Sequence, residues 1–232
     1  MPMRLRQIVM VAGDLGAAEQ QVEEQLGVER CYRDPGVAEF GLRNALFPIG
    51  DQFLEVVSPT QPGTPAGRQI DKRGGDGGYM VMVEVDDLAP LRRRVAELDV
   101  RIAYEAVTTG IVGLHLHPAD IGGAILSVDR ADPWGEWPWA GPSWRGHMRT
   151  DRVAAVLAVV IEAADPSAMA ARWAAVLGCA TVDDRVTLPN GGELRFIPAG
   201  DRGEGVAGFV LAASDPARVG TATICNCRFD IV

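Results

Sequence analysis

One phrase of sequence, an apolar strand followed by an aspartate and then a helix, occurs four times within the 232 residues. In the first two copies the residues after the aspartate favour a helix with apolar side chains on one face, in the third Pro166 stands at the first helical position, and the fourth copy is curtailed. The four aspartates stand 73, 78 and 50 residues apart and are Asp14, Asp87, Asp165 and Asp215. Asp14 is predicted to be the N-cap of the first helix, with its carboxylate accepting a hydrogen bond from an exposed backbone N–H. The chain is therefore predicted to repeat one strand–helix unit.

Strands are predicted after each helix, in the places where short apolar runs alternate with turn residues. In the first repeat they fall at 31–32, 38–47 and 52–57, and in the second at 100–105, 111–117 and 124–128. The third repeat has strands at 185–188 and 193–197, joined by a tight hairpin at Asn190-Gly191. The fourth keeps a brief connection over 217–223 and one last strand over 224–232. The fourth copy is therefore expected to be shortened.

Residues 132–144 hold four of the five tryptophans among three prolines and two glycines. Proline and glycine exclude a regular helix there. One interpretation is an ordered linker whose indoles cover the apolar end of a domain. The other is an aromatic lid over a ligand pocket, with Trp134 and Trp137 in contact with the ligand. In both cases the segment is expected to be packed, because four exposed indoles would form a large apolar patch.

Composition narrows the classes of partner. The net charge of −9 argues against a nucleic-acid partner. The longest apolar run, 153–164, is shorter than the roughly 20 residues that cross a membrane, and no signal peptide opens the chain. A cytoplasmic protein is expected.

Four cysteines are too few and too scattered for a disulfide scaffold. Cys225 and Cys227 lie in a strand-like run and are expected to be a buried, reduced pair, with metal or redox work as the alternative.

The stretch from Leu114 to Asp129, LHLHPADIGGAILSVD, carries a family resemblance. It resembles the ends of the βαβββ modules of the vicinal-oxygen-chelate superfamily, which includes glyoxalases, extradiol dioxygenases, bleomycin-resistance proteins and methylmalonyl-CoA epimerases. The His-Pro-x-x-x-Gly-Gly run looks most like that of the epimerases. The resemblance implies an α+β fold in which tandem modules form two consecutive glyoxalase-like domains. We expect them at 1–130 and 150–232, the second degenerate and shortened, with a linker at 131–149.

The same resemblance implies where a metal would be held. The first and last strands of the first module match the family pattern with Gln7 and Glu55. The second module departs from it, because Met80 and Ser127 stand where the metal enzymes have a histidine and a carboxylate. Thioether and hydroxyl groups do not suit the divalent ions that these enzymes use. No cofactor is therefore expected, and at most a weakly bound divalent metal.

Three further side chains are candidates for the ligand-binding cleft or for catalysis. His115 and His117 share one face of a strand, and three roles stay open for them: structural hydrogen bonding, ligand or acid–base contact, and metal binding. Glu39 resembles a base of the epimerases, and an inward, buried position would suit a general base. The alternative for Glu39 is an exposed strand residue. The partner base would be expected at Ser127, which is a poor proton acceptor, so a two-base epimerisation would be incomplete.

Three classes of function follow. The leading one is a protein that binds a small molecule in the cleft of the first domain, with its metal site largely lost, as in the bleomycin-resistance proteins. The cleft is expected to contain Gln7, Glu55, Met80, Ser127, His115, His117, Trp134 and Trp137. The alternative is a glyoxalase-like or epimerase-like lyase or isomerase that acts next to a carbonyl or thioester through Glu39 and Glu55. The third is a scaffold. A homodimer is one expectation for this superfamily, although four modules in one chain can pair internally.

Overall fold

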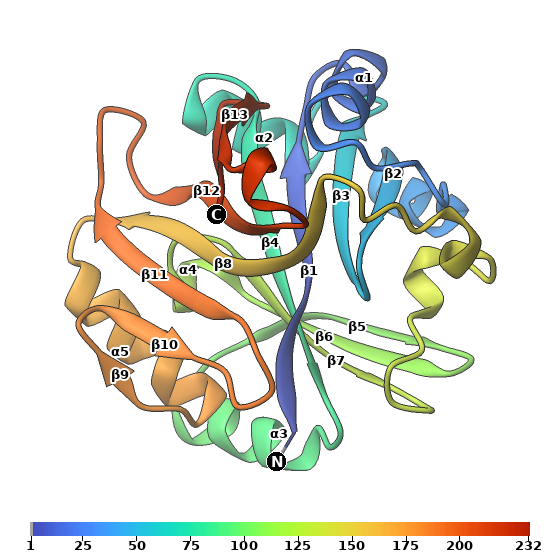
Figure 1. The fold of residues 1–232 in the computed structure, drawn as a ribbon. Helices are drawn as coiled ribbons and strands as arrows, with labels where there is room; N and C mark the ends of the chain where they lie inside the picture. The colour runs from blue at the N-terminus through green and yellow to red at the C-terminus, as the bar shows by residue number, and fades with distance from the viewer. Residues whose placement is uncertain (1) are drawn as a thin grey trace. The chain divides into compact units, whose positions relative to one another are not determined.

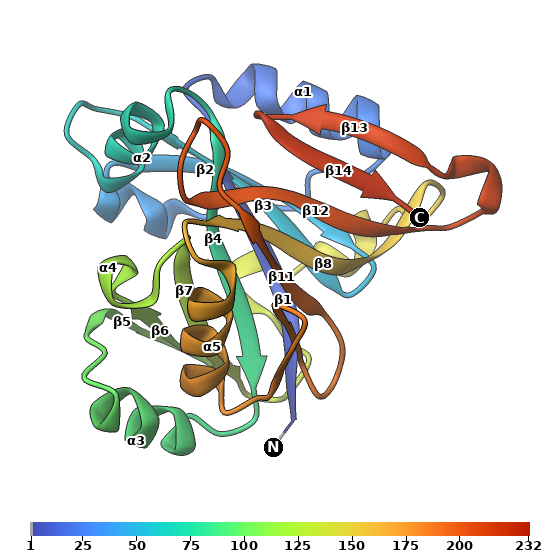
Figure 2. The ribbon, with the colours of Figure 1, turned by 90° about the vertical axis from the view of Figure 1, so that its left-hand side faces the viewer.

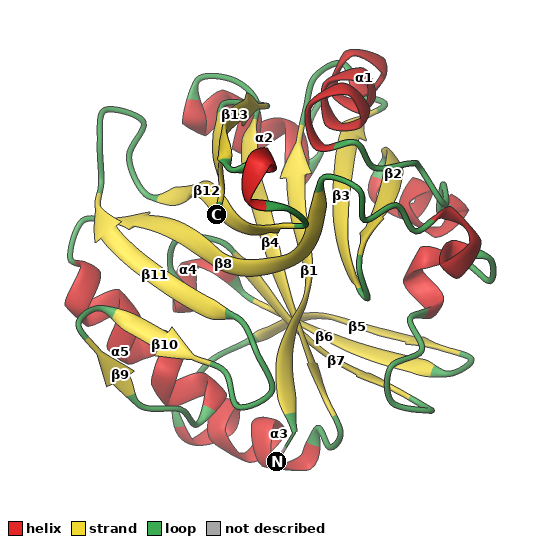
Figure 3. Cartoon of the chain, in the orientation of Figure 1, coloured by secondary structure: helices red, strands yellow, loops and turns green. Residues whose placement is uncertain are grey.

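The computed structural model describes residues 2–232, and within them the strands form two sheets of seven strands each (Figure 1). The first sheet takes all of its strands from residues 3–131 and the second takes all of its strands from residues 153–231, so the two sheets belong to successive parts of the chain, called here its first and second halves. Helices lie between the strands of each module (Figure 3). The predicted α+β fold with tandem modules is confirmed.

The first sheet has the strand order β2-β3-β1-β4-β7-β6-β5. Its strands are β1 (Met3–Val11), β2 (Leu42–Ile49), β3 (Gln52–Pro59), β4 (Gly77–Val85), β5 (Ile102–Thr108), β6 (Ile111–Leu116) and β7 (Ile125–Ala131). The helical segments of this half are α1 (Leu15–Leu26), the 3₁₀ helix η1 (Pro35–Phe40), α2 (Pro65–Arg73), α3 (Ala89–Glu97) and α4 (Pro118–Ile121).

The second sheet has the strand order β13-β14-β12-β8-β11-β10-β9. Its strands are β8 (Val153–Ala163), β9 (Thr181–Val182), β10 (Arg185–Thr187), β11 (Glu193–Pro198), β12 (Gly205–Ala213), β13 (Gly220–Ile224) and β14 (Cys227–Ile231). The helical segments are η2 (Pro138–Ala140), η3 (Trp144–His147), α5 (Pro166–Leu177) and η4 (Pro216–Arg218). Helix α5 packs along β11 (Figure 2).

Strand pairing repeats in all four modules. In each one the first strand pairs in parallel with the last, as β1 with β3, β4 with β7, β8 with β11, and β12 with β14. The remaining pairs within each module are antiparallel. A parallel pair needs a crossover connection, and the helix after each first strand supplies part of it. The internal repeat seen in the sequence is therefore a repeat of structure.

The chain also divides into two compact units, each of which takes modules from both halves. Unit 1 contains the chain up to Arg6, Met80–Pro138 and Ala158–Val206. Unit 2 contains Gln7–Tyr79, Trp139–Leu157 and Ala207–Val232. The sheets thus follow the two halves of the chain, while the compact units do not. The domain boundaries expected at 130 and 150 stay a prediction.

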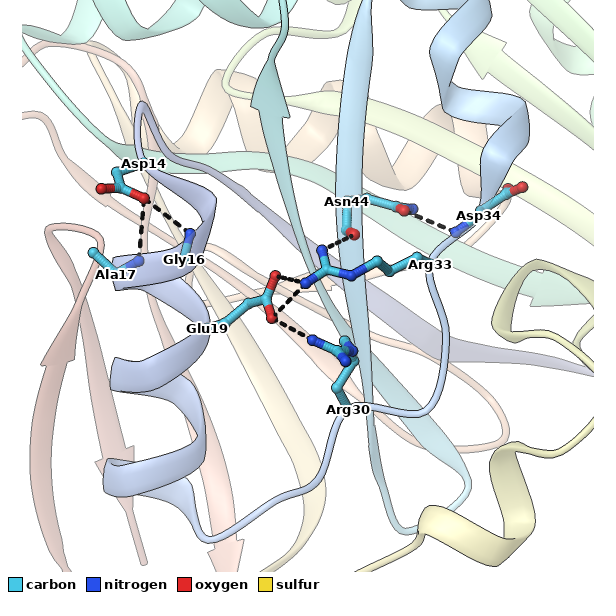
Figure 4. A network of polar contacts seen from close by, with 8 residues as sticks. All are labelled: Asp14, Gly16, Ala17, Glu19, Arg30, Arg33, Asp34 and Asn44. Atoms are coloured by element: carbon cyan, nitrogen blue, oxygen red, sulfur yellow. Dashed lines mark hydrogen bonds and ion pairs between the residues drawn. The ribbon is translucent and has the colours of Figure 1, made fainter.

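The four repeated aspartates all lie at the starts of helical segments, and three of them are N-caps, namely Asp14, Asp165 and Asp215, while Asp87 stands one residue before the N-cap of α3. Asp14, Asp87, Asp165 and Asp215 each accept a hydrogen bond from a backbone N–H two or three residues further on, at 2.8 to 3.2 Å. The side chain of each aspartate satisfies an N–H that has no partner within its helix. Figure 4 shows the cap that Asp14 makes on α1. The N-cap predicted from the sequence for Asp14 is confirmed.

The strand predicted over residues 38–47 begins later. Residues 35–40 form η1, which starts after the capping side chain of Asp34 and ends at Gly41, whose φ of 68° is easily reached only by glycine. The strand β2 then begins at Leu42. Helix α2 was not expected, although its start carries a signal, since Thr64 caps it and Pro65 occupies its first turn.

The last predicted strand is in fact a hairpin. Cys225 and Asn226 have φ values of 49° and 55° and form the two-residue turn between β13 and β14. Two left-handed residues in succession give the twist that favours a tight hairpin. Cys225 and Cys227 therefore do not share one strand, although both thiols are buried and free. Burial raises the pKa of Cys225 to about 12.

The tryptophan-rich segment is mostly packed. The side chain of Trp137 is 1% exposed and that of Trp144 is buried against Phe53, while Trp134 is 39% exposed. The expectation of an ordered segment is confirmed for these two buried indoles. Among residues 2–232, no helix is both long and apolar enough to cross a membrane.

Candidate functional site

A buried carboxyl group forms the centre of the candidate site in unit 2. Glu55 lies on β3, where it pairs with Val9 of β1 and with Leu46 of β2. Gln7 precedes Val9 by two residues and Asn44 precedes Leu46 by two residues, so both belong to the same face as Glu55. The exposed fractions of Gln7, Asn44 and Glu55 are 1%, 2% and 8%. Three neighbouring strands thus bring three polar side chains together inside an otherwise apolar layer.

Two amide groups hold the carboxyl group of Glu55. Nε2 of Gln7 donates to Oε2 of Glu55 at 2.7 Å. Nδ2 of Asn44 donates to Oε1 of Glu55 at 2.7 Å. Each carboxylate oxygen therefore has a buried donor, which lowers the cost of burying this group. Gln7 and Glu55, two of the four residues expected in one cleft, are in contact, and Asn44 is a further residue that was not predicted. Its signal was a polar residue in the apolar run LRNALFPI of β2.

Burial governs the electrostatics of this group. It raises the pKa of Glu55 to about 7, since the charged form loses its hydration. The donors Asn44 and Gln7 act against this shift, while the negative charge of Asp34 adds to it. Burial also raises the pKa of the neighbouring phenol of Tyr79 to about 12, and the charge of Glu55 contributes to that rise. Near neutral pH, both the protonated and the ionised forms of Glu55 are populated.

A second set of contacts holds Asn44 in place (Figure 4). The backbone N–H of Asp34 donates to Oδ1 of Asn44 at 2.8 Å. The guanidinium of Arg33 donates to the backbone carbonyl of Asn44 at 3.1 Å. The same guanidinium pairs with Glu19 on α1. Because its oxygen faces Asp34, the amide of Asn44 presents its NH₂ group to Glu55.

Met80 and Ser127 belong to unit 1, where Ser127 is fully buried. The hydroxyl of Ser127 donates to Asp129, a buried carboxylate two residues along the same face of β7. Asp129 pairs across the sheet with Glu84, which is fully buried and accepts hydrogen bonds from Arg4 and from the backbone N–H of Gly135. Carboxylates therefore do lie on this part of the sheet, at positions that the sequence analysis did not select. The convergence of Met80 and Ser127 with Gln7 and Glu55 stays a prediction.

The two histidines have different surroundings. His117 caps α4, because its Nδ1 accepts from the backbone N–H of Ala119 at 3.2 Å. His115 pairs with Ser127 across the strands and lies beside Tyr104, with ring centroids 5.5 Å apart. Burial lowers the pKa of His115 to about 4, so its imidazole is neutral at neutral pH. His117 thus has a structural hydrogen bond, and a ligand contact for either histidine stays a prediction.

Glu39 differs from the expectation in its secondary structure. It lies in η1 and not on a strand, and its side chain is exposed. The tight turn begun by Pro35 and ended by Gly41 carries the chain out of the sheet before β2 begins. Glu39 therefore lacks the inward, buried position that would suit it to act as a base. Its catalytic role remains only a prediction from the family resemblance.

The tryptophans expected in the cleft both lie beside arginines of β1. The guanidinium of Arg4 lies 5.0 Å from the ring centre of Trp134, and that of Arg6 lies 5.4 Å from the ring centre of Trp137. Cation–π contacts of this kind anchor the segment within unit 1. A contact between either indole and a ligand stays a prediction.

Comparison with known proteins identifies the family. The sequence model of a family described as "glyoxalase-like domain" matches residues 8–177, which is well over half of the chain. The chain belongs to the glyoxalase-like domain family. The match includes Glu55 and its amide partner Asn44 on β2, and it begins one residue after the other amide partner, Gln7 on β1.

Relatives of this glyoxalase-like chain include epimerases. The mitochondrial methylmalonyl-CoA epimerase of Bos taurus is 26% identical over 131 residues, which cover 55% of this chain and 74% of the relative. A variant of the Streptomyces coelicolor methylmalonyl-CoA epimerase, in complex with 2-nitronate-propionyl-CoA, superimposes with a TM-score of 0.51 at 21% identity, covering 56% of this chain and 96% of that one. A hypothetical protein from Staphylococcus aureus superimposes over the full length of both chains, with a TM-score of 0.73 at 11% identity.

The superfamily implies a divalent metal, and the donors available near Glu55 decide whether this glyoxalase-like chain could hold one. Both oxygens of Glu55 already accept amide N–H groups, so they face donors and not a cation. Among residues 2–232, no cluster of three His, Cys, Asp or Glu side chains has an arrangement that could hold a metal ion. The donor set around Glu55 therefore does not fit a divalent ion.

Proposed function

We propose that the chain binds a small molecule at the Glu55 site of unit 2, with the carboxyl group of Glu55 as the polar anchor. The supporting observation is a buried carboxyl group, each of whose two oxygens accepts a hydrogen bond from a side-chain amide. Burying an ionisable group is costly, and an apolar residue would stabilise this layer of strands better. Ionisable groups with strongly shifted pKa values in the interior are concentrated at functional sites.

A thioester or another carbonyl compound is the ligand class that we propose. Structural relatives of the chain are epimerases, and one is seen with 2-nitronate-propionyl-CoA. A protonated Glu55 can donate a hydrogen bond to a carbonyl oxygen, and an ionised Glu55 can accept one. Because the pKa of Glu55 is about 7, the site can serve either kind of partner near neutral pH.

A second candidate function is proton transfer at a carbon next to the carbonyl group. The observation that favours it is the raised pKa of Glu55, since a general base is most effective when its pKa lies near the working pH. In this function the ionised Glu55 removes the acidic proton, and the resulting acid returns a proton to the same carbon. A single base of this kind exchanges the proton with solvent, and it does not require the second base that the sequence lacks at Ser127.

Ligand binding is tested by thermal shift and calorimetry with propionyl-CoA, methylmalonyl-CoA and free CoA. A ligand at about 100 times its Kd stabilises the folded state by about 2.7 kcal/mol. We expect stabilisation by a thioester but not by free CoA. We further expect Glu55→Gln to weaken the effect and Glu23→Gln, at an exposed residue of α1, to preserve it. Equal responses of the two variants would contradict the assignment of Glu55 as the anchor.

The second candidate is tested by following deuterium uptake. The chain is incubated with methylmalonyl-CoA in D₂O, and the signal of the α-proton is recorded by NMR. Loss of this signal faster than in buffer, abolished by Glu55→Gln, would support proton transfer. Binding without exchange would leave the first proposal in place and refute the second.

A further inference from the structure

We propose that Arg33, anchored by Glu19, is a positioning residue that fixes the amide of Asn44 and through it the carboxyl group of Glu55. The inference deepens the proposed function, because it concerns the orientation of the same anchor. All of the contacts involved lie within unit 2. They connect the surface helix α1 with a buried side chain on β3.

The contacts begin at α1. Glu19 is buried on this helix and accepts from two arginines, Arg30 and Arg33 (Figure 4). Nη1 of Arg30 lies 2.7 Å from Oε2 of Glu19. Nη2 of Arg33 lies 2.9 Å from the same oxygen and 2.7 Å from Oε1. Both arginines therefore neutralise one carboxylate that would be expensive to bury alone.

Only one of these arginines reaches the strand that carries Asn44. Nη1 of Arg33 donates to the backbone carbonyl of Asn44 at 3.1 Å, while its Nη2 is bound to Glu19. A guanidinium can bind two acceptors at once because its donors form a planar, rigid fork. Arg33 thus joins the helix to β2 at the position of Asn44.

The residue after Arg33 completes the orientation. The backbone N–H of Asp34 donates to Oδ1 of Asn44 at 2.8 Å. An amide whose oxygen is held in this way must turn its NH₂ group in the opposite direction, where Nδ2 meets Oε1 of Glu55 at 2.7 Å. Holding Arg33 on Glu19 also holds the backbone of Asp34, so one ion pair sets both contacts to Asn44.

The functional consequence concerns Glu55. Its carboxyl group has freedom to rotate about its terminal torsion, which is broad for glutamate. The donors Gln7 and Asn44, one on each oxygen, restrict that rotation. Loss of the Asn44 donor would leave Oε1 without this partner and the carboxyl group less well oriented for a ligand.

The test compares Arg33→Met with Arg30→Met in the full-length chain. Each variant removes one ion pair to Glu19, and only Arg33→Met removes the contact with Asn44. The readout is hydrogen exchange of the Asn44 side-chain NH₂ group, followed by ¹H–¹⁵N NMR without any ligand. We expect the exchange rate to rise about fivefold or more in Arg33→Met, because the loss of one ordinary hydrogen bond changes an equilibrium constant by about that factor. In Arg30→Met the exchange rate should stay at the wild-type value.

Two results would overturn the proposal. One is an unchanged exchange rate of the Asn44 amide in Arg33→Met, and the other is an equal rise in Arg30→Met. If Arg33→Met does not fold, Arg33→Lys keeps the positive charge beside Glu19 but lacks the fork that serves two acceptors, and the same two results apply. Since no ligand is present, failure here is separate from failure of the proposed binding function.

Discussion

The raised pKa of Glu55 predicts a specific dependence of stability on pH. The perturbation is Glu55→Gln, which keeps the volume of the side chain and removes its titration. The amide will meet at least one N–H donor with its own NH₂ group, which adds a destabilisation of about 1–3 kcal/mol that does not vary with pH. The test is the part of the difference in unfolding free energy between wild type and Glu55→Gln that changes with pH.

The magnitude follows from the two pKa values. The pKa of Glu55 rises from 4.5 to about 7 in the folded chain, so between these values the folded state binds more protons than the unfolded state. Stability therefore falls as pH rises through this window. The contribution is fully present below pH 4.5 and is lost above pH 7. At about 1.4 kcal/mol for each pH unit, the free energy of unfolding of wild type should fall by about 3 kcal/mol relative to that of Glu55→Gln as the pH rises from 4.5 to 7.

The assay is urea denaturation of wild type and variant at intervals from pH 4.5 to 8. A control is Gln52→Leu, because Gln52 lies on β3 and is as buried as Glu55 but does not titrate. Its side-chain amide donates to the backbone carbonyl of Val156 and accepts from the backbone N–H of the same residue. Its difference from wild type should be independent of pH. A difference between wild type and Glu55→Gln that stays constant across the window would refute the argument that burial destabilises the ionised form of Glu55.

Three other predictions concern packing, capping and metal. Trp137→Ala should cost about 3–5 kcal/mol, because its indole is fully buried, whereas Trp134→Ala should cost about 1 kcal/mol or less, and urea denaturation of both variants would measure this contrast. Asp14→Ala should cost about 1 kcal/mol through loss of the cap on α1, and an unchanged midpoint in urea would contradict the capping role. Purified wild type should contain no stoichiometric Zn, Ni, Co or Mn. One ion per chain by elemental analysis, lost in Glu55→Ala, would show instead that the donors of Glu55 rearrange to bind metal.

Local signals in the sequence accounted for much of the fold. The aspartates that precede each helix, such as Asp14 and Asp165, act through backbone N–H groups only two or three residues away. Such contacts depend on neighbouring residues alone, so a repeat of the sequence reliably marks a repeat of the structure. The errors were missed signals of the same local kind. Asp34 and Pro35 mark the start of the 3₁₀ helix η1, and Cys225-Asn226 forms a turn that was not recognised.

The candidate site was only half visible in the sequence. Gln7 and Glu55 could be proposed from the family resemblance, because each matches a position in a motif. Asn44 could not, since its contact with Glu55 depends on the register that places β2 antiparallel to β3 and β1 parallel to it. The link from Arg33 to Asn44 depends further on how the loop after α1 folds against β2.

The sequence by itself therefore determined the repeated module, the helix caps and the family of this chain, all of which rest on residue patterns within short windows. The tertiary structure alone decided which polar side chains share the interior with Glu55, and hence its proton affinity. Desolvation and hydrogen bonding depend on distances between residues far apart in the sequence, such as the 2.7 Å between the amide of Gln7 and the carboxyl group of Glu55. Those distances are set by the pairing of strands.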